Sequence, residues 1–291
     1  MTHFKEGIDI CNNTRNLAAK YVEEVLKDST TISEAEFRDK IKNKFAENKN
    51  IYERGWYEPP PFGIAALFSE INNFGRLRFD TLRKQEFWSS TKYRMEKGSV
   101  GIVYLSPVNR GTATIGDFGL TIYQGDNVSI KQHFKNSLDV IEQIADYTQV
   151  GMEFREIHNQ ARKLFKEIGV NNDRTVTYTD KVGTNLGHTI PWTWENPSEL
   201  EINVINSRDF NKIKDLISHK RINVNREEKF KVPENVAFTI EARLEDTNNL
   251  SLPLVFFHVI VQFIDGNKRV NSNFNSVFKL LKMGSFVKSK Y

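Results

Sequence analysis

The segment AFTIEARL (residues 237–244) places one acidic side chain inside a run of β-branched, aromatic and aliphatic residues. Such residues are typical of β-strands, so we expect a strand over residues 235–244. Glu241 lies between Ile240 and Ala242 in this strand. An ionised carboxylate in a buried strand costs free energy unless it has a partner. The segment therefore predicts a strand that carries Glu241 into a polar site.

Three further segments have the composition of buried strands. They are VGIVYL (residues 100–105), TIGDFGLTIY (114–123) and LVFFHVIVQFI (254–264). Residues 109–111 (Asn-Arg-Gly) supply turn residues between the first two. Residues 265–266 (Asp-Gly) are a turn signal after the third. We therefore expect strand pairs on either side of the central part of the chain.

Two amphipathic helices are expected between these strands, because apolar residues recur there with the 3.6-residue period of a helix. The apolar positions are Leu138, Ile141, Ile144 and Ala145 in the first, and Phe154, Ile157, Ala161, Leu164, Phe165 and Ile168 in the second. Gly169 is expected to end the second helix as its C-cap.

The first ninety residues are expected to be helical with one extended break. Thr14 is predicted to cap a first helix. Ser33 and Glu36 form a capping-box pattern ahead of a second. The break is EPPPFG (residues 58–63), where three consecutive prolines exclude a helix.

We expect the whole chain, residues 1–291, to form one domain. Residues 1–94 are its helical entry segment. The stretch between His188 and Asn235 is polar and rich in Lys and Asn, with little periodic pattern. We interpret residues 198–233 as an insertion over the edge of the domain.

The composition narrows the class of protein. The 41 basic and 37 acidic residues nearly cancel, leaving a net charge of +4, which does not favour a nucleic-acid binder. No apolar run reaches the roughly 20 residues of a membrane span, and the N-terminus has no signal-peptide core. The single cysteine, Cys11, excludes an internal disulfide and fits a reducing compartment. The expectation is a cytoplasmic protein that binds neither nucleic acid nor membrane.

Four phrases resemble, in order, the motifs of the pita-bread metallopeptidases, a family that includes methionine aminopeptidases, aminopeptidase P, prolidases and creatinase. They are GDFGLT (residues 116–121), NLGHTIPW (185–192), AFTIEARL and FHVIVQFIDGN (257–267). The resemblance covers about residues 14–270. It implies an α+β protein, with a curved antiparallel sheet backed by helices and pseudo-twofold symmetry.

The resemblance also implies a metal site. The family holds two divalent metals with two Asp, one His and two Glu. The matching positions here are Asp117, His188 and Glu241, while Ser106 falls on the first Asp and Phe257 on the last Glu. With two carboxylates gone, the repulsion between two dications is poorly offset. We therefore expect one ion, Fe, Mn, Co or Zn, held by Asp117, His188 and Glu241.

Other family positions also differ. Leu120 takes the place of an Arg, and Trp194 takes the place of a second His that contacts substrate. The residues expected to contact substrate are Ser106, Thr121, Trp192, Trp194, Glu195, Phe257 and His258. Ser106 as a nucleophile is disfavoured, because no nucleophile-elbow motif surrounds it. His258 is read as a core histidine, and a register slip would make it a ligand.

The function implied is a metal-dependent enzyme for a small amide, amino-acid or peptide-like substrate, with His188 and Glu241 as catalytic residues. A single iron with open positions could instead activate oxygen, since a His with two carboxylates is related to non-haem iron sites. The third alternative is a catalytically inactive binding module. Whether the chain forms a homodimer is left open.

Overall fold

The structure is a computed structural model that describes residues 4–29 and 31–291. Three small antiparallel sheets form its centre. The strands are β1 (Ile64–Phe68), β2 (Val100–Leu105) and β3 (Phe118–Tyr123) in the first sheet; β4 (Val170–Asn171), β6 (Arg243–Asp246) and β7 (Val255–Phe256) in the second; and β5 (Val236–Ile240), β8 (Val259–Ile264) and β9 (Asn267–Asn271) in the third.

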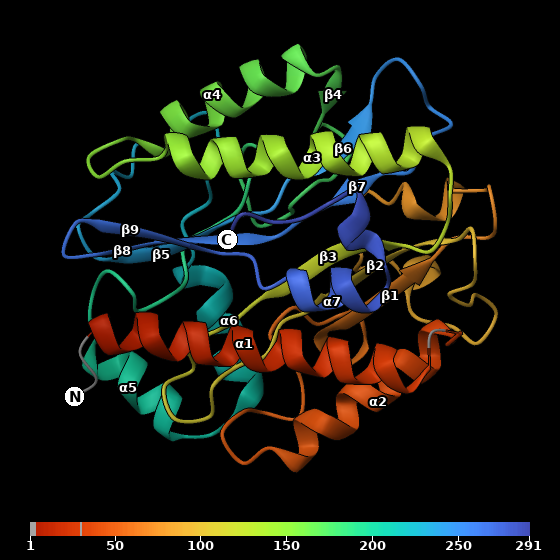
Figure 1. Cartoon of the computed structure of the whole chain (residues 1–291). Coiled ribbons are helices and arrows are strands. Elements are labelled where there is room, and N and C mark those ends of the chain that lie inside the picture. Colours follow the sequence, from red (N-terminus) through yellow and green to blue (C-terminus); the bar gives the residue numbers. More distant parts are fainter. Residues whose placement is uncertain (1–3, 30) are drawn as a thin grey trace.

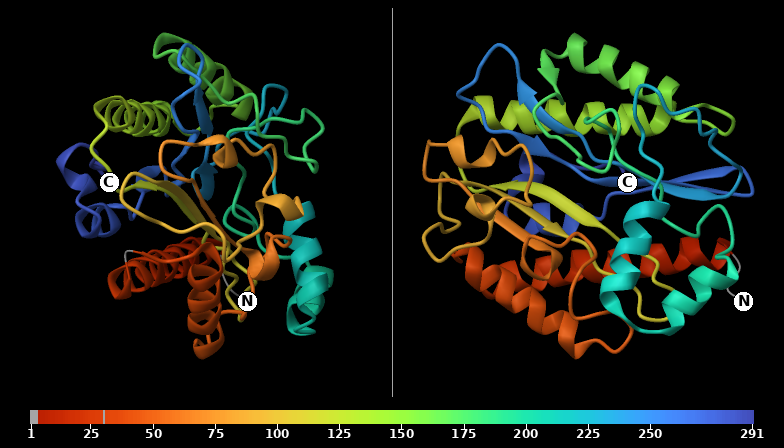
Figure 2. Two further views of the ribbon diagram at one scale, coloured as in Figure 1. Left: turned by 90° about the vertical axis from the view of Figure 1, so that its right-hand side faces the viewer. Right: turned by 180° about the vertical axis from the view of Figure 1, so that it is seen from behind.

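Helices pack around these sheets. They are α1 (Phe4–Asp28), α2 (Glu34–Glu47), α3 (Val128–Tyr147), α4 (Phe154–Glu167), α5 (Glu199–Asn206), α6 (Phe210–Lys220) and α7 (Asn275–Leu280), with short 3₁₀ turns η1 (Pro61–Gly63), η2 (Gly75–Leu77), η3 (Gln85–Phe87) and η4 (Met283–Ser285). Figure 1 shows α1 and α2 below the strands and α3 and α4 above them. The left view of Figure 2 shows α1 and α3 on one side of the strands and α6 on the other. A helix pair followed by antiparallel strands thus occurs twice along the chain.

The two halves meet along a seam between β3 and β7. The Thr121 hydroxyl donates to the carbonyl of Phe256 (3.1 Å) and accepts from its N–H (2.6 Å). The His258 N–H donates to the carbonyl of Gly119 (3.0 Å), and Leu120 pairs with Phe257. These contacts join the first sheet to the second along the seam.

Several local predictions are confirmed. The Ser33–Glu36 capping box begins α2, and Gly169 follows α4 with a positive φ of 71°. The turn at residues 109–111 connects β2 to β3 as expected, and the apolar stripes of residues 138–145 and 154–168 lie in α3 and α4. Among the described helices, none combines the length and apolarity needed to cross a bilayer.

The predicted cap at Thr14 is wrong. Helix α1 begins at Phe4 and runs through this position without a break, because the apolar stripe of the helix extends further back to Ile8 and Cys11. The Thr14 hydroxyl donates to the carbonyl of Ile10 (2.7 Å), as hydroxyls inside helices often do.

The predicted pattern-poor stretch contains two helices. Helix α5 begins at a capping box of Ser198 and Glu201, and the Asp209 side chain caps α6. These capping signals were present in the sequence. The strand predicted over residues 114–123 is also shorter, since β3 begins at Phe118.

Two of the predicted strands are each interrupted by two residues that lie outside the ladder. Residues 235–244 form β5 and β6, with Glu241 and Ala242 between them. Residues 254–264 form β7 and β8, with Phe257 and His258 between them. Since β5 pairs with β8 and β6 pairs with β7, the two breaks lie side by side. The chain leaves the ladder there, and Glu241 and His258 face each other.

Candidate active site

Three polar side chains converge at the ends of separate elements. Nε2 of His188 lies 3.6 Å from Oδ2 of Asp117 and 3.8 Å from Oε1 of Glu241. Asp117 directly precedes β3, and Glu241 directly follows β5. All three side chains are buried. His258 joins the group, with Nε2 3.7 Å from Oε2 of Glu241.

Gly187 allows His188 to reach this position. Its φ is +149°, and a Cβ there would overlap the carbonyl of Thr239 in β5. The loop is then fixed to the strand by two hydrogen bonds, from the His188 N–H to the Thr239 hydroxyl (2.9 Å) and from the Thr239 N–H to the His188 carbonyl (2.8 Å). A side chain at residue 187 would push His188 away from the carboxylates.

Trp56 orients Asp117. Its indole Nε1–H donates to Oδ1 of Asp117 (2.7 Å), and its ring meets the His188 ring edge-on, with centroids 5.6 Å apart. Oδ2 of Asp117 has no hydrogen-bond partner within 3.5 Å among the described residues, although the nearby Tyr104 hydroxyl lowers the pKa of Asp117. One carboxylate oxygen is therefore fixed by Trp56, and the other lies beside His188.

Burial sets the charges of this group. It raises the pKa of Asp117 to about 7, against the hydrogen bond from Trp56, which lowers it. It also raises the pKa of Glu241, partly offset by the nearby guanidinium groups of Arg243 and Arg221. The pKa of His188 is lowered well below its usual value, first by burial and then by Arg221. The imidazole is therefore neutral at pH 7.

The tautomer of His188 follows from its other nitrogen. Nδ1 lies 3.1 Å from the carbonyl oxygen of Thr189, which can only accept a hydrogen bond. Nδ1 therefore carries the proton, and the Nε2 lone pair faces Asp117 and Glu241. A neutral imidazole fixed in this way is the usual form of a metal-binding histidine.

The two donor separations measured from His188 fit one divalent ion after a small contraction. Two ligand atoms that each lie about 2.1 Å from an ion are about 3.0–3.4 Å apart. The separations of 3.6 and 3.8 Å here exceed that by a few tenths of an ångström. In the described part of the chain, accordingly, no group of three or more His, Cys, Asp and Glu side chains is already spaced as a metal site. The lone pair of His188 and Oδ2 of Asp117 nevertheless match what an ion requires.

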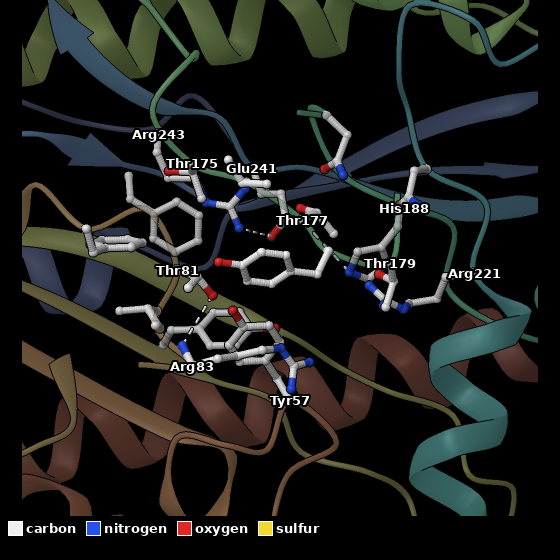
Figure 3. A pocket seen from close by; sticks show the side chains of 18 of the residues that line it. Tyr57, Thr81, Arg83, Thr175, Thr177, Thr179, His188, Arg221, Glu241 and Arg243 are labelled. Carbon is white, nitrogen blue, oxygen red and sulfur yellow. Dashed lines mark hydrogen bonds and ion pairs between the residues drawn. The ribbon is translucent and has the colours of Figure 1, made fainter. Parts of the chain in front are cut away.

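Two members of the group, His188 and Glu241, line a pocket with positively charged walls, and Asp117 and His258 lie outside its lining. Arg83, Arg221 and Arg243 line it together with Tyr57, Tyr104 and threonines of residues 175–179. Figure 3 shows Arg243 beside Glu241, and Arg221 on the His188 side. The free volume is about 50 Å³. Since a buried water needs roughly 10–15 Å³ of such volume, the pocket in this state takes only a few waters or a ligand group of similar size.

Arg221 is the cation most available to a ligand. Its guanidinium lies 4.1 Å over the Trp56 ring, and its Nε is buried without a hydrogen-bond partner among the described residues. Arg83, by contrast, donates to the carbonyl of Glu58 (3.1 Å), and Nη2 of Arg243 lies 3.7 Å from Oε2 of Glu241. Arg221 thus presents unused donors to the pocket.

Three predicted contact residues have structural partners. The Ser106 hydroxyl donates to the carbonyl of Gly63 (2.9 Å) and accepts from the N–H of Tyr57 (3.1 Å). Thr121 joins β3 to β7. The Phe257 ring packs against Phe134, Phe274 and Phe278, away from the pocket. It is the neighbouring His258 that faces Glu241.

The residues predicted around position 194 also lie outside this pocket. Trp192 is buried in a separate core cluster, and Trp194 packs against Phe230. Glu195 forms an ion pair with Lys220 (2.7 Å). The structure therefore brings together Asp117, His188, Glu241 and His258, and places the remaining predicted contacts elsewhere.

Sequence reasoning missed Trp56 and the three arginines. Arg243 was readable, because it lies two residues after Glu241 in the same predicted strand, and alternate residues share a face. Trp56 lies just before the proline-rich break. That break drew attention to the region, but nothing in the sequence singled out Trp56. Arg221 lies in the polar insertion and carried no signal.

Replacing Trp56 by Phe should weaken metal binding by about 10- to 100-fold, because loss of a partner that orients a ligand typically costs that much. Oδ1 of Asp117 would lose its donor, so the pH needed for binding should rise as well. Calorimetric titration with Co²⁺ measures both. Trp192→Phe is the matched control, since that indole is buried but lies outside the pocket. Equal affinities for the two variants would contradict the role given to Trp56.

The sequence matches no protein-family model and no curated protein. Solved structures match over most of the chain. X-Pro aminopeptidase from Thermotoga maritima MSB8 is 12% identical, with a TM-score of 0.60 over 90% of this chain and 60% of that one. Prolidase from Pyrococcus furiosus is 17% identical, with a TM-score of 0.61 over 91% and 63%.

A shorter protein matches along nearly its whole length. Methionine aminopeptidase from Rickettsia prowazekii is 11% identical, with a TM-score of 0.58 over 93% of this chain and 98% of that one. The chain thus spans about 60% of the X-Pro aminopeptidase and prolidase structures and almost all of the methionine aminopeptidase. At these identities the likeness is one of fold.

Proposed function

Since the chain has the pita-bread fold in a divergent form, we propose that it is a metal-dependent enzyme for a small amide, amino-acid or peptide-like substrate. The ion would be held by Asp117, His188 and Glu241. The observation that supports this proposal is that a carboxylate oxygen of Asp117 and one of Glu241 lie 3.6 and 3.8 Å from the same nitrogen of His188.

A bound ion in such a site polarises a carbonyl or lowers the pKa of a bound water. The side chains around it have separate tasks. Trp56 holds Asp117 with one oxygen turned to the ion, and Gly187 and Thr239 hold His188 against β5. Arg243 compensates the charge of Glu241 from the pocket side. Asp117, His188 and Glu241 are all buried, which limits their contact with bulk water.

The pocket favours a substrate with a negative group. A planar guanidinium matches a carboxylate through two parallel hydrogen bonds. Arg221 offers such a group, stacked on Trp56 and lacking a partner at Nε among the described residues. The substrate carboxylate would bind at Arg221, and its reacting amide would lie toward His188 and Glu241. Because the free volume is about 50 Å³, the pocket walls must move apart to admit such a substrate.

Metal analysis of the whole protein tests the proposal. Dialysis against Zn²⁺, Mn²⁺, Co²⁺ or anaerobic Fe²⁺ should give about one tightly bound ion per chain. Glu241→Gln should weaken binding by more than about 100-fold, because removing a direct ligand costs more than removing an orienting partner. Glu227→Gln, an exposed surface change, is the control. No ion above background, or equal binding by the two variants, would contradict the proposal.

The reaction class is tested separately with the loaded protein. Release of amine from a panel of small N-acyl amino acids would support hydrolysis. Oxygen consumption with iron and the same compounds would instead support oxidative chemistry. If the protein binds the ion but catalyses neither reaction, the result would indicate a metal-binding module.

A further inference from the structure

A fully buried guanidinium lies directly behind the site. Arg15, in α1, is 0% exposed. It donates to the backbone carbonyls of Asp117, His258 (2.5 Å) and Ser272 (2.7 Å), and to Oδ1 of Asn273 (3.0 Å). Its Nη1 also lies 3.0 Å from Nδ1 of His258. One side chain of the first helix thus contacts the backbone of both Asp117 and His258.

The partners of Arg15 are unusual for a buried cation. They are carbonyl and amide oxygens and one imidazole nitrogen, and its charge lies over the rings of Phe118 and Phe274 at 5.2 and 5.9 Å. Taking a guanidinium out of water is costly, and neutral partners compensate it less well than a carboxylate. An apolar residue at this position would leave the buried carbonyl oxygens of Asp117, His258 and Ser272 without this donor, which is also costly. Arg15 therefore fixes the backbone of Asp117 and His258 in place.

The contact with His258 fixes where the ring proton lies. A guanidinium has five N–H donors and no acceptor, so Nδ1 of His258 must accept. A neutral imidazole that accepts at Nδ1 carries its proton on Nε2. This is the opposite tautomer to that of His188, whose Nδ1 donates to the carbonyl of Thr189.

The Nε2 atom of His258 has no hydrogen-bond partner among the described residues, although the ring is fully buried. It lies 3.7 Å from Oε2 of Glu241. Nε2–H can reach that oxygen after a shift of less than an ångström, whereas a protonated nitrogen cannot bind a metal. Two histidines in one site are thereby assigned different tasks.

We propose that Arg15 is a positioning residue that holds His258 as the Nε2–H tautomer, so that His258 donates a hydrogen bond toward Glu241 and stays out of the metal coordination shell. The part that concerns the metal rests on the proposed function. The tautomer itself does not, because the contacts that fix it lie within this chain. The consequence is a site with one histidine ligand, although two imidazoles face it.

Nitrogen-15 NMR of the metal-free, full-length protein tests the tautomer directly. Histidine-labelled protein gives six ring spin systems, matching its six histidines, and His258→Gln and His188→Gln assign the two of interest. The expected result is an Nε2-protonated His258 and an Nδ1-protonated His188. An Nδ1-protonated His258 in the wild-type spectrum would overturn the proposal, whatever the variants do.

Arg15→Lys and Arg15→Met then test the cause. In Arg15→Met, which removes every donor, His258 should shift to a mixture of tautomers or to the Nδ1–H form, whereas Arg15→Lys, whose ammonium can still donate to Nδ1, should retain more of the Nε2–H form. His188 should be unchanged in both variants. A merely structural role for Arg15 would leave the His258 pattern as in the wild type. If neither variant folds, the wild-type spectrum still decides the tautomer.

Titration with Co²⁺ tests the metal part. His258→Gln keeps an amide N–H donor near the position of Nε2, so its affinity should stay within about threefold of the wild type. His188→Gln should lose more than about 100-fold, as expected for a direct ligand. A large loss in both variants would show that His258 coordinates. If wild-type protein binds no Co²⁺, the proposed function fails, and the NMR result still stands on its own.

Discussion

Asp117→Asn is expected to remove metal binding and, at the same time, to stabilise the metal-free protein above pH 7. Loss of a direct carboxylate ligand should lower Co²⁺ affinity by more than about 100-fold. The asparagine keeps an oxygen that can accept from Trp56 Nε1–H. Its amide N–H₂ takes the place of Oδ2, 3.6 Å from the His188 lone pair, and can donate to it.

The pH dependence follows from the pKa of Asp117, which burial raises from 3.8 to about 7. Between these values the folded protein holds a proton that the unfolded chain has released. The stability of the metal-free protein therefore falls as pH rises from about 4 to about 7, by about 1.4 kcal/mol for each step of one in pH. Asparagine cannot ionise, so it avoids this loss.

Thermal unfolding with EDTA measures the effect. We expect the Tm of Asp117→Asn to exceed that of the wild type by roughly 5–10 °C at pH 8, with a smaller difference at pH 5. Metal affinity of the wild type should also fall steeply below pH 7, because ligands bind metals only when deprotonated. Asp173→Asn, on the surface, is the control and should bind metal normally. A destabilised Asp117→Asn protein at pH 8 would contradict this account.

Glu34→Ala is expected to cost about 3–5 kcal/mol of unfolding free energy, because it leaves a paired cation without its partner. Glu34 is fully buried at the start of α2. It accepts from Nη2 (2.8 Å) and Nε (2.9 Å) of Arg76, and from the backbone N–H groups of Phe68 (2.6 Å) and Ser90 (3.0 Å). Burial raises the pKa of Glu34, and these bonds oppose that rise.

Chemical denaturation of the two variants Glu34→Ala and Glu24→Ala gives the comparison. Glu24 pairs with Lys44 at the surface, where such a pair contributes less than about 1 kcal/mol. The buried pair joins α2 to β1 and to the segment of residues 75–90, so its loss should also increase protease sensitivity there. Similar costs for both variants would mean that the buried network contributes little.

Much of the fold could be predicted because the periodic patterns are strong. The core faces of α3 and α4, and the apolar runs of β2, β5 and β8, need only local composition to be recognised. The breaks at Glu241 and His258 could not be predicted, since both segments read as continuous strands. Each break arises because β6 and β7 turn to pair with each other, which is a tertiary effect.

Some residues of the candidate site could likewise be predicted from the sequence, and others could not. Asp117, His188 and Glu241 could be placed from short phrases and a resemblance, and they lie together in the structure. Trp56 and Arg221 could not, because they meet only through folding: Trp56 is 61 residues from the carboxylate that it contacts. Arg15 was equally hidden, since a single Arg within a helical pattern is ordinarily a surface residue.

The seam at Thr121 and Phe256 has a thermodynamic consequence. Asp117 and Trp56 belong to one half of the molecule, and His188 and Glu241 belong to the other. An ion held by Asp117, His188 and Glu241 would act as a crosslink between the halves, in addition to the hydrogen bonds of the seam and of Arg15. A change that brings the halves closer by a few tenths of an ångström should increase the affinity for the ion. By linkage, the bound ion stabilises the closed arrangement of the halves by the same free energy. Ion binding and the free energy of separating the two halves are then thermodynamically linked. The coupling can be measured as a change in ion affinity or as a change in stability.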